Sequence, residues 1–351
     1  MRSRTLVTPL ALCVLLIGCT TSPGVSPAAP TPSPVIRAAL ESYLTDLEKA
    51  DEFSGVVLVA KDFVPFATKA TGFADSARGS PNATGTNFNI SSITRLFTAV
   101  AIGELVDQGK VGLDDPLTKY LPSYPKPAGD RITIAMLLAH TAGTGDYLND
   151  PGYLRVRDSF DTLDELIAAV DIGIPAGTVP GAAYNYSNTG YLLLGAVIEK
   201  TSGRDYYDYV TEAVLQRVGV AGGFLSNTED ERKLRGYALG YRPDGTTNWK
   251  TLPARGTPAG GAYASAPDLL AFHRALVNGV LVRPETLRKL VLQPPPAGKS
   301  ALPITSAVFA GDDVGASAVF GMSDKGYTVV VLANISGQAQ PVADRILKLL
   351  P

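Results

Sequence analysis

The strongest β-strand patterns of this chain lie near its two ends, and helical patterns fill the long stretch between them. Residues 55–60 (GVVLVA) form a β-branched run, and residues 65–71 can pair with them as a hairpin. Near the other end, residues 316–320 and 327–333 (YTVVVLA) flank a Ser-Asp-Lys-Gly turn. We therefore expect an α/β (α+β) fold in which both chain ends build one antiparallel sheet flanked by helices.

Apolar residues at helical spacing predict the helices around this sheet. Residues 35–49 place their apolar side chains on one helix face. Residues 93–108 are apolar around most of the helix, which indicates burial on most sides. We expect a mainly helical lobe, inserted into the sheet, at about residues 110–260. Further helical patterns occur at 162–170, 190–201, 206–218, 267–278 and 341–350.

The first 19 residues are predicted to be an export signal. Arg2 and Arg4 precede a short apolar stretch, residues 10–17, which ends in Leu-Ile-Gly-Cys. This ending resembles a bacterial lipobox, in which Cys19 would carry the lipid. An ordinary secretory signal with an accidental cysteine is the alternative. The lipobox predicts an exported protein that is lipid-anchored to a bacterial membrane and faces the periplasm or the cell surface.

A tether and one globular domain are expected to follow the signal. Residues 20–34 are rich in Pro, Ser, Thr and Ala, a composition typical of an extended, unpacked segment. The remaining residues, 35–351, are long enough for a large core, since 45% of the whole chain is hydrophobic. The tether would hold this domain away from the membrane surface.

The composition excludes several kinds of site. The other cysteine of the sequence, Cys13, lies inside the predicted signal, which leaves the mature domain without disulfides or a cysteine nucleophile. Two histidines, His140 and His273, are too few for a typical zinc site. The net charge is −2 and no basic cluster occurs, so nucleic acid is not an expected partner. We find no nucleotide, metal or flavin motif and expect no cofactor.

A serine before the apolar helix 93–108 is the first candidate for chemistry. Ser92 stands in the stretch FNISSITRLFTAVAI. A serine nucleophile without histidine needs another base, and a buried lysine at i+3 can serve because the two residues share a helix face. A tyrosine phenol near cations is another base. The residue three positions after Ser92 is Arg95. An arginine keeps the positive charge but cannot take a proton at neutral pH.

Five ordered segments resemble the serine β-lactamase and penicillin-binding superfamily, in the branch that contains class C β-lactamases, D,D-carboxypeptidases and related esterases. The resemblance runs from about residue 53 to the end of the chain. It implies the β-lactamase/transpeptidase-like fold. The segments are 88–122 (FNISSITRLFTAVAIGELVDQGKVGLDDPLTKYLP), 132–147 (ITIAMLLAHTAGTGDY), 180–203 (PGAAYNYSNTGYLLLGAVIEKTSG), 255–276 (RGTPAGGAYASAPDLLAFHRAL) and 326–334 (GYTVVVLAN).

The resemblance implies an acyl-enzyme site, and the first of its departures from the family pattern is Arg95. The serine of the family's Ser-x-x-Lys motif corresponds to Ser92, and the lysine corresponds to Arg95. The family's Tyr-x-Asn motif corresponds to Tyr186 and Asn188. By this resemblance Tyr186 acts as base and acid, Asn188 orients the substrate, and Arg95 supplies charge.

The family's third motif, Lys-Thr-Gly or His-x-Gly on a strand facing the serine, falls on residues 309–311. Phe309 then replaces the cation or imidazole, and Gly311 is retained. The next residue, Asp312, would donate a backbone N–H to the oxyanion hole. Loss of the cation would weaken binding of a substrate carboxylate. A carboxylate at Asp312 would oppose the negative charge that develops in the oxyanion hole.

Three functions remain open at this point. The first is a serine hydrolase that acts on an ester, a D-amino-acid peptide or a β-lactam, with the apolar Phe309 favouring esters. The second is an inactive relative that binds a cell-wall fragment or a protein partner. The third is a scaffold without a pocket function, which gives no reason for Ser92, Tyr186 and Asn188 to occur together. Taken singly, these residues could be a helix cap, a packed aromatic ring and a turn residue.

Overall fold

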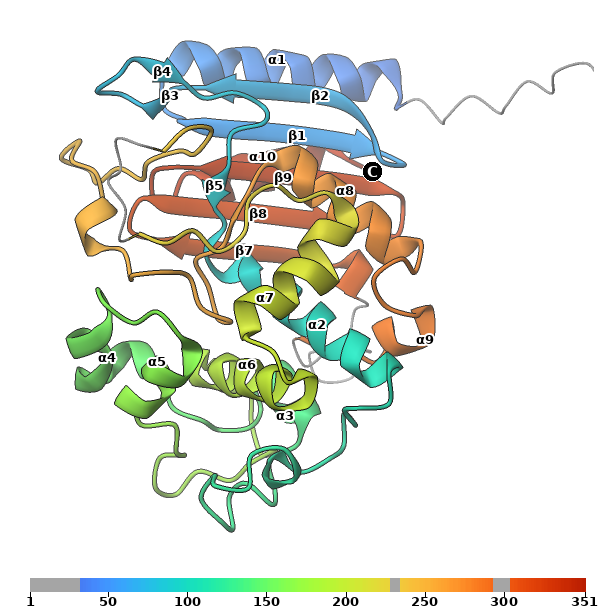
Figure 1. Cartoon of the computed structure of the whole chain (residues 1–351). Coiled ribbons are helices and arrows are strands. Elements are labelled where there is room, and N and C mark those ends of the chain that lie inside the picture. Colours follow the sequence, from blue (N-terminus) through green and yellow to red (C-terminus); the bar gives the residue numbers. More distant parts are fainter. Residues whose placement is uncertain (1–31, 228–233, 293–303) are drawn as a thin grey trace, which may run out of the picture.

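The computed structural model describes residues 32–227, 234–292 and 304–351, and a five-stranded antiparallel sheet forms its centre (Figure 1). The predicted export signal, Cys19 and nearly all of the predicted tether lie outside the described residues. Neighbouring strands pair antiparallel throughout the sheet, as predicted. The strand order is β2 (Val64–Thr71), β1 (Gly55–Lys61), β9 (Tyr327–Ala333), β8 (Ala316–Met322) and β7 (Val308–Asp313).

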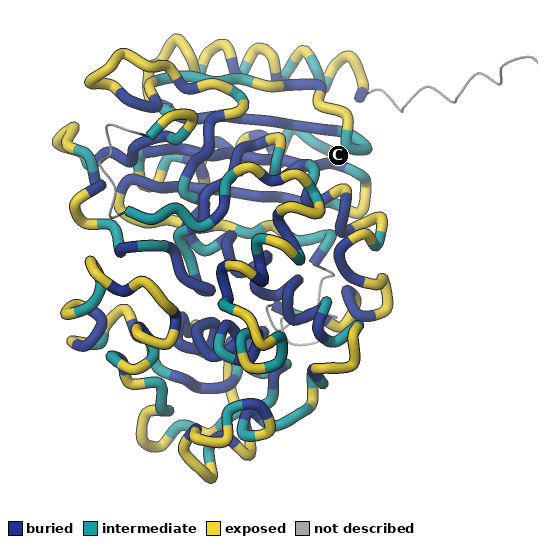
Figure 2. Tube along the Cα trace, in the orientation of Figure 1, coloured by how far each residue is buried: buried dark blue, intermediate teal, exposed yellow. Residues whose placement is uncertain are grey.

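Both faces of the sheet are buried, because its central strands carry apolar side chains at nearly every position (Figure 2). Successive residues of a strand point to opposite faces. On β1, Val57 and Val59 therefore join one hydrophobic core, while Val56 and Leu58 join the other. This double burial explains why the sequence of these strands is continuously apolar rather than alternating.

Helices α1 (Pro34–Ala50) and α10 (Ala339–Leu349) cover one face of the sheet. Helix α1 begins at the last residue of the predicted tether, and its first turn is capped by Ser33, whose side chain accepts a hydrogen bond from the Val35 N–H. The other face packs against α8 (Ala266–Val277). The helices predicted at both ends of the chain are thus confirmed.

The remaining helices lie beside the β7 edge of the sheet (Figure 1). We call residues 134–215, which hold α3 to α7, the helical part. The bounds are α2 (Arg95–Asp107), α3 (Ile134–Leu138), α4 (Pro151–Val156), α5 (Leu163–Ala169), α6 (Asn188–Ser202), α7 (Tyr206–Val210) and α9 (Pro284–Leu287). Two short ladders complete the fold: β3 (Phe73–Asp75) with β4 (Ser80–Pro81), and β5 (Phe88–Asn89) with β6 (Tyr263–Ala264).

Two of the predicted helices are less regular than their sequence pattern. The helix expected at 93–108 begins as a 3₁₀ turn, Ser91–Thr94, and continues as α2. The helix expected at 206–218 consists of α7, a π turn at Thr211–Leu215 and a 3₁₀ turn at Gln216–Val218. No helix among the described residues is long and apolar enough to span a membrane.

Strand β7 packs directly against the 3₁₀ turn Ser91–Thr94. A glycine makes this approach possible, because a Cβ atom on Gly311 would lie 2.6 Å from the Ser92 nitrogen and 2.8 Å from the Ser91 Cβ. Carbon atoms of side chains do not approach other atoms so closely without displacing them. The contact ties the edge of the sheet to the start of α2.

Replacing Gly311 with alanine is therefore expected to push β7 and the 3₁₀ turn apart. We expect Gly311→Ala to lower the unfolding free energy by about 1–3 kcal/mol, the usual cost of overpacking. Urea unfolding measures this change. Gly85→Ala is the matched control, because a Cβ there meets no atom within 4 Å. Equal unfolding free energies for the two variants would contradict the packing argument.

Candidate active site

The candidate nucleophile and the candidate base are in hydrogen-bond contact. Ser92 lies in the first turn of the 3₁₀ segment, where Ser91 adopts a left-handed backbone (φ 46°) and donates its N–H to the Asn89 side chain. Tyr186 lies in the loop before α6 and is 44% exposed. The Ser92 Oγ and the Tyr186 hydroxyl share a hydrogen bond of 3.0 Å. The structure thus brings together two residues that are far apart in the sequence.

Arg95 lies beside this pair as a buried cation. Its side chain is 7% exposed, and its guanidinium carbon lies 4.4 Å from the ring centre of Tyr186 and 5.3 Å from that of Tyr191. A cation at such distances is attracted to the face of an aromatic ring. Arg95 would therefore offset negative charge on Tyr186, the role that the sequence comparison left to it.

A chain of polar contacts holds Arg95 from the other side. One guanidinium nitrogen donates a hydrogen bond of 2.5 Å to the Asn188 Oδ1. The Asn188 Nδ2 in turn donates to both carboxylate oxygens of Asp146, at 2.9 and 2.8 Å. Asn188 is therefore a partner of Arg95 and Asp146 in this structure, in addition to lining the cavity beside Ser92.

His140 is a site residue that the sequence reasoning missed, since it considered this histidine only as a zinc ligand. Its ring stacks on Tyr186, with ring centres 4.8 Å apart and 22° between the planes. Its Nδ1 accepts the Ser187 N–H at 3.1 Å, and its backbone is left-handed (φ 56°). The signal that could have found it is its place in segment 132–147, which resembles the family.

Burial of the ring, and then the charge of Arg95, lower the pKa of His140 to about 4. His140 is therefore neutral at pH 7. Because its Nδ1 accepts a hydrogen bond, the neutral ring carries its proton on Nε2. Tyr186 thus contacts one permanent cation and one neutral imidazole.

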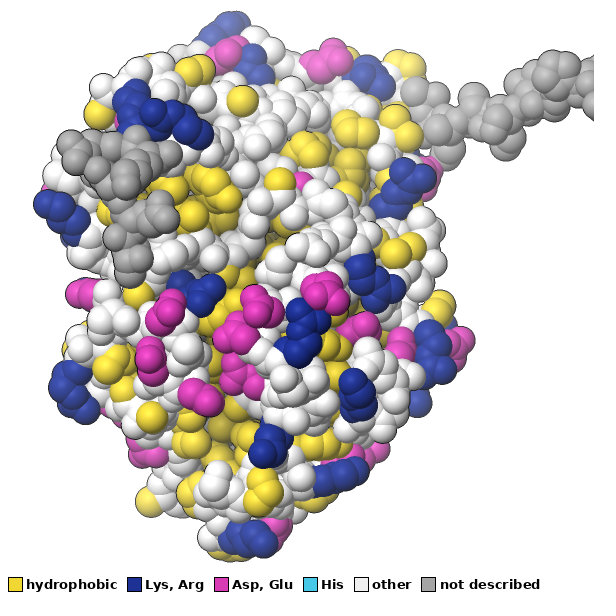
Figure 3. All heavy atoms as spheres, in the orientation of Figure 1, with side chains coloured by type: hydrophobic (Ala, Val, Ile, Leu, Met, Phe, Trp, Pro, Cys, Tyr) yellow, Lys and Arg dark blue, Asp and Glu magenta, His cyan; other side chains and the backbone are white. Residues whose placement is uncertain are grey.

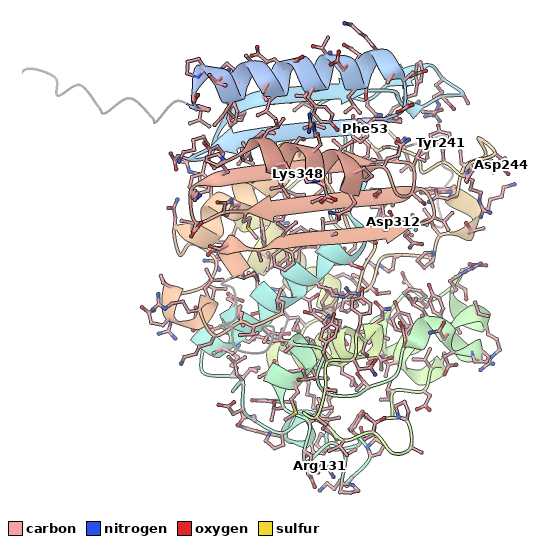
Figure 4. All side chains as sticks on the ribbon, turned by 180° about the vertical axis from the view of Figure 1, so that it is seen from behind. Phe53, Arg131, Tyr241, Asp244, Asp312 and Lys348 are labelled. Atoms are coloured by element: carbon pink, nitrogen blue, oxygen red, sulfur yellow. The ribbon has the colours of Figure 1, made fainter. Side chains whose placement is uncertain are left out.

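Ser92 and Tyr186 open into a cavity of about 290 Å³ between the sheet and the helical part. Tyr147, Leu148 and Tyr153 line it on the side of the helical part, and Asp312 and Asp313 line it on the side of β7. Figure 4 shows Asp312 on the edge strand β7, near the end of the strand. Among the described lining residues, these two aspartates are the charged ones, so the cavity has an acidic side.

The two aspartates are held by backbone donors. Asp312 accepts the Gly337 N–H at 2.7 Å, and Asp313 accepts the Val314 N–H at 2.7 Å. Loss of water around Asp313 within the cavity, and then the charge of Asp312, raise the pKa of the Asp313 carboxyl. Beyond the cavity, acidic side chains also gather over α5 and α7 (Figure 3).

Phe309 occupies the position where the resemblance predicted the lost cation. It packs partly against the main core. It also lines a second, small hollow of about 70 Å³ that reaches Arg95, His140 and Ser92. The structure therefore places Phe309 and Asp312 on the same strand around Gly311, next to the candidate nucleophile. Strand β7 itself was assigned in the sequence through the resemblance and not through a strand pattern.

A family profile described as beta-lactamase matches residues 40–350. The chain belongs to the beta-lactamase family. PbpX of Bacillus subtilis (strain 168) is 28% identical over 256 residues, which cover 72% of this chain and 61% of that protein. Penicillin-binding protein 4* of the same strain is 29% identical over 224 residues, 62% of this chain and 48% of that protein. This family member spans about half to three fifths of these curated relatives.

Solved structures of the family superpose on most of the chain. The penicillin binding protein from Bacillus halodurans is 30% identical, with a TM-score of 0.75 over 88% of this chain and 99% of that one. D-amino acid amidase from Ochrobactrum anthropi SV3, solved with L-phenylalanine amide, shares the fold at 22% identity, with a TM-score of 0.71 over 90% and 98% of the two chains. The family and the fold predicted from the sequence are confirmed.

The low pKa of His140 predicts a loss of stability in mild acid. In the unfolded chain a histidine takes up a proton near its ordinary value of about 6.5, whereas folded His140 stays neutral down to about 4. Stability therefore falls as the pH falls through this window. His140 accounts for about 2 kcal/mol of the loss in unfolding free energy between pH 7 and pH 5.

His140→Asn should remove about this part of the pH dependence. Asparagine tolerates the left-handed backbone and can accept the Ser187 N–H through its oxygen. Urea unfolding of both proteins at pH 7 and pH 5 gives the comparison. His273→Asn is the comparison variant. Burial also lowers the pKa of His273 to about 4, so this change, in the core and away from the site, should remove a similar part of the pH dependence. An unchanged pH dependence in His140→Asn would show that the folded histidine titrates normally.

Proposed function

We propose that this protein is a cell-envelope serine hydrolase that cleaves an ester or amide through an acyl-enzyme on Ser92. The observation that carries the proposal is the 3.0 Å hydrogen bond between the Ser92 Oγ and the Tyr186 hydroxyl at the wall of a cavity. A nucleophile within hydrogen-bond reach of a base is the arrangement that covalent catalysis requires. Membership of the beta-lactamase family supports the same chemistry.

The steps follow from this geometry. The Ser92 Oγ attacks the substrate carbonyl carbon while its proton passes to the Tyr186 phenolate oxygen. Tyr186 returns the proton to the leaving alcohol or amine as that bond breaks, which leaves an acyl group on Ser92. A water then gives its proton to Tyr186 and attacks the acyl carbon, and the proton returns to Ser92. Arg95, 4.4 Å from the Tyr186 ring, compensates the charge on that phenolate.

The negative charge on the carbonyl oxygen needs donors of its own. The first N–H groups of a helical turn have no partner within the turn, so the Ser92 N–H is available in principle. By the family resemblance, the Asp312 N–H is the second donor. The Asp312 carboxylate lies close to this position and reduces the stabilisation, because like charges repel. Slow turnover is therefore part of the proposal.

The charges around the cavity favour neutral or cationic substrates over carboxylates. Phe309 is apolar, and the charged residues among the described lining of the main cavity are Asp312 and Asp313. Arg95, the nearest buried cation, is engaged by Asn188 and the two tyrosine rings. A β-lactam or a peptide C-terminus would bring its carboxylate toward the acidic side. Esters and amides without a carboxylate are thus the proposed substrates.

Binding without turnover is the second candidate function. The position of Arg95 favours it, since the residue that replaces the family lysine cannot take a proton and forms its hydrogen bond with Asn188. In that case the cavity would hold a cell-wall fragment or a segment of a partner. In either case we propose export and lipid attachment at Cys19, because the lipobox resemblance and the Pro-rich tether predict an envelope protein.

A fluorophosphonate probe tests the acyl-enzyme directly. We expect covalent labelling of the wild type and none of Ser92→Ala. Tyr186→Phe should be labelled about 10²- to 10⁴-fold more slowly, the usual cost of losing a base. Arg95→Lys should be labelled faster than the wild type, because a lysine in the same buried place can share the proton. Intact mass spectrometry over time measures all four rates.

The binding function gives a different pattern in the same experiment. It predicts that the probe labels Ser92 neither in the wild type nor in Arg95→Lys. Faster labelling of Arg95→Lys, together with a silent wild type, would identify the arginine as the change that stopped turnover. A labelled penicillin, tested in parallel, should react more slowly than the fluorophosphonate because it carries a carboxylate.

Three small esters of similar length test the charge preference. We expect kcat/KM for monomethyl succinate to be at least about 10-fold below that for methyl butyrate, equivalent to one unfavourable charge contact of about 1.4 kcal/mol. β-Alanine methyl ester, which carries an ammonium group, should match or exceed methyl butyrate. The double variant Asp312→Asn/Asp313→Asn should reduce these differences. Asp324→Asn, an exposed aspartate in the β8–β9 turn, is the control.

A further inference from the structure

One carboxylate, Asp146, contacts the candidate site without a part in the proposed chemistry. It lies directly before the 3₁₀ turn Tyr147–Asn149 and caps that turn by accepting the Leu148 N–H at 3.1 Å. The same carboxylate accepts the Asn188 Nδ2 through both oxygens, at 2.9 and 2.8 Å. Two further contacts, from Asn188 to Arg95 and from Arg95 to Tyr186, connect it to the candidate base.

The hydrogen bonds that Asp146 accepts favour one orientation of the Asn188 amide. An amide has almost the same shape in its two orientations but opposite polarity. With its NH₂ toward Asp146, Asn188 presents its oxygen to the guanidinium of Arg95. The reverse orientation would set NH₂ against guanidinium and oxygen against carboxylate. An ionised carboxylate can only accept hydrogen bonds, so the reverse orientation of the Asn188 amide is unfavourable.

Arg95 depends on that amide oxygen. Among the described residues it forms no ion pair, and its buried Nε has no hydrogen-bond partner there. Its other close contacts are the faces of Tyr186 and Tyr191, which attract a cation without fixing its rotation in the plane of the ring. The hydrogen bond of 2.5 Å to Asn188 is therefore the directional contact that sets where the guanidinium lies.

We propose that Asp146 is a positioning residue, which holds the Arg95 guanidinium against Tyr186 by fixing the orientation of Asn188. The inference rests on the proposed function for its effect on catalysis. Its structural content, the position of Arg95, can be measured whether or not the protein turns over a substrate. A buried cation held by neutral partners is expensive to keep. Asp146, an anion that reaches Arg95 through Asn188, lowers the free-energy cost of burying the guanidinium.

Other titratable groups surround Tyr186 and stay in place in the test. His140 stacks on its ring, and Tyr191 packs beside Arg95. Tyr184 lies against His140, with ring centres 5.9 Å apart. From β7, Asp312 and Asp313 line the same cavity. Any variant of Asp146 must therefore be compared with one that changes charge elsewhere.

The position of Arg95 is read from the NMR signal of its Nε–H in protein labelled with ¹⁵N-arginine. The rings of Tyr186 and Tyr191 should displace this proton signal from the usual arginine position, and its absence in Arg95→Lys assigns it. Asp146→Leu keeps the branched skeleton of four side-chain heavy atoms but accepts no hydrogen bond, so the signal should return toward the usual position. Asp146→Asn can still accept from the Asn188 NH₂ and should keep the displaced signal. Asp324→Leu is the control.

The catalytic effect is read from the pH dependence of fluorophosphonate labelling. In Asp146→Leu the cation moves away from Tyr186, so the labelling profile should move to higher pH. Simple removal of a negative charge would move it the opposite way. Asp146→Leu should cause no rise in an Arg95→Met background, because the two residues act through one contact chain.

The outcomes separate this inference from the proposed function. An Arg95 signal that is unchanged in Asp146→Leu, or a downward shift of the labelling profile, would overturn the positioning role. So would equal behaviour of the asparagine and leucine variants. If the wild type is not labelled at all, the proposed function fails, and the Arg95 signal alone still decides whether Asp146 positions the guanidinium.

Discussion

The close backbone contact between strand β7 and the turn that carries Ser92 is the constraint on which the rest of the site depends. It requires a residue without a side chain, because any Cβ at Gly311 would overlap the Ser92 nitrogen. The contact joins the edge of the sheet to the start of α2, and so sets β7 and its aspartates beside the nucleophile. The helical part then closes the cavity from the other side.

The same region holds an unusual solution to burying a cation. Arg95 is almost completely buried, yet its close neighbours are two tyrosine faces and one amide oxygen. A lysine in this place could exchange a proton with its neighbours, whereas an arginine provides a fixed charge. In the proposed mechanism, the site would therefore combine a fixed cation with a tyrosine that carries the whole proton transfer. That division of roles is consistent with slow chemistry or with binding alone.

The cavity shows how the charges of a site can depart from the family pattern while the fold is kept. Phe309 removes the cation that the family resemblance predicts, and the two following acids reverse the charge on that side. Both acids are exposed, so their effect on a charged ligand should weaken as the salt concentration rises. Under the proposed function, Phe309, Asp312 and Asp313 of strand β7 would then determine which substrate charges the cavity accepts.

The sequence determined the elements and the family. Continuous β-branched runs predicted the buried strands, helical spacing predicted α1, α2, α8 and α10, and motif order located Ser92, Tyr186 and Asn188. The tertiary structure decided which side chains contact one another in the site. His140, which the sequence did not select, stacks on Tyr186, and Asp146 contacts Arg95 through Asn188. Such contacts join residues far apart in the chain, and periodicity reports only on neighbours within one element, so only folding could bring them together.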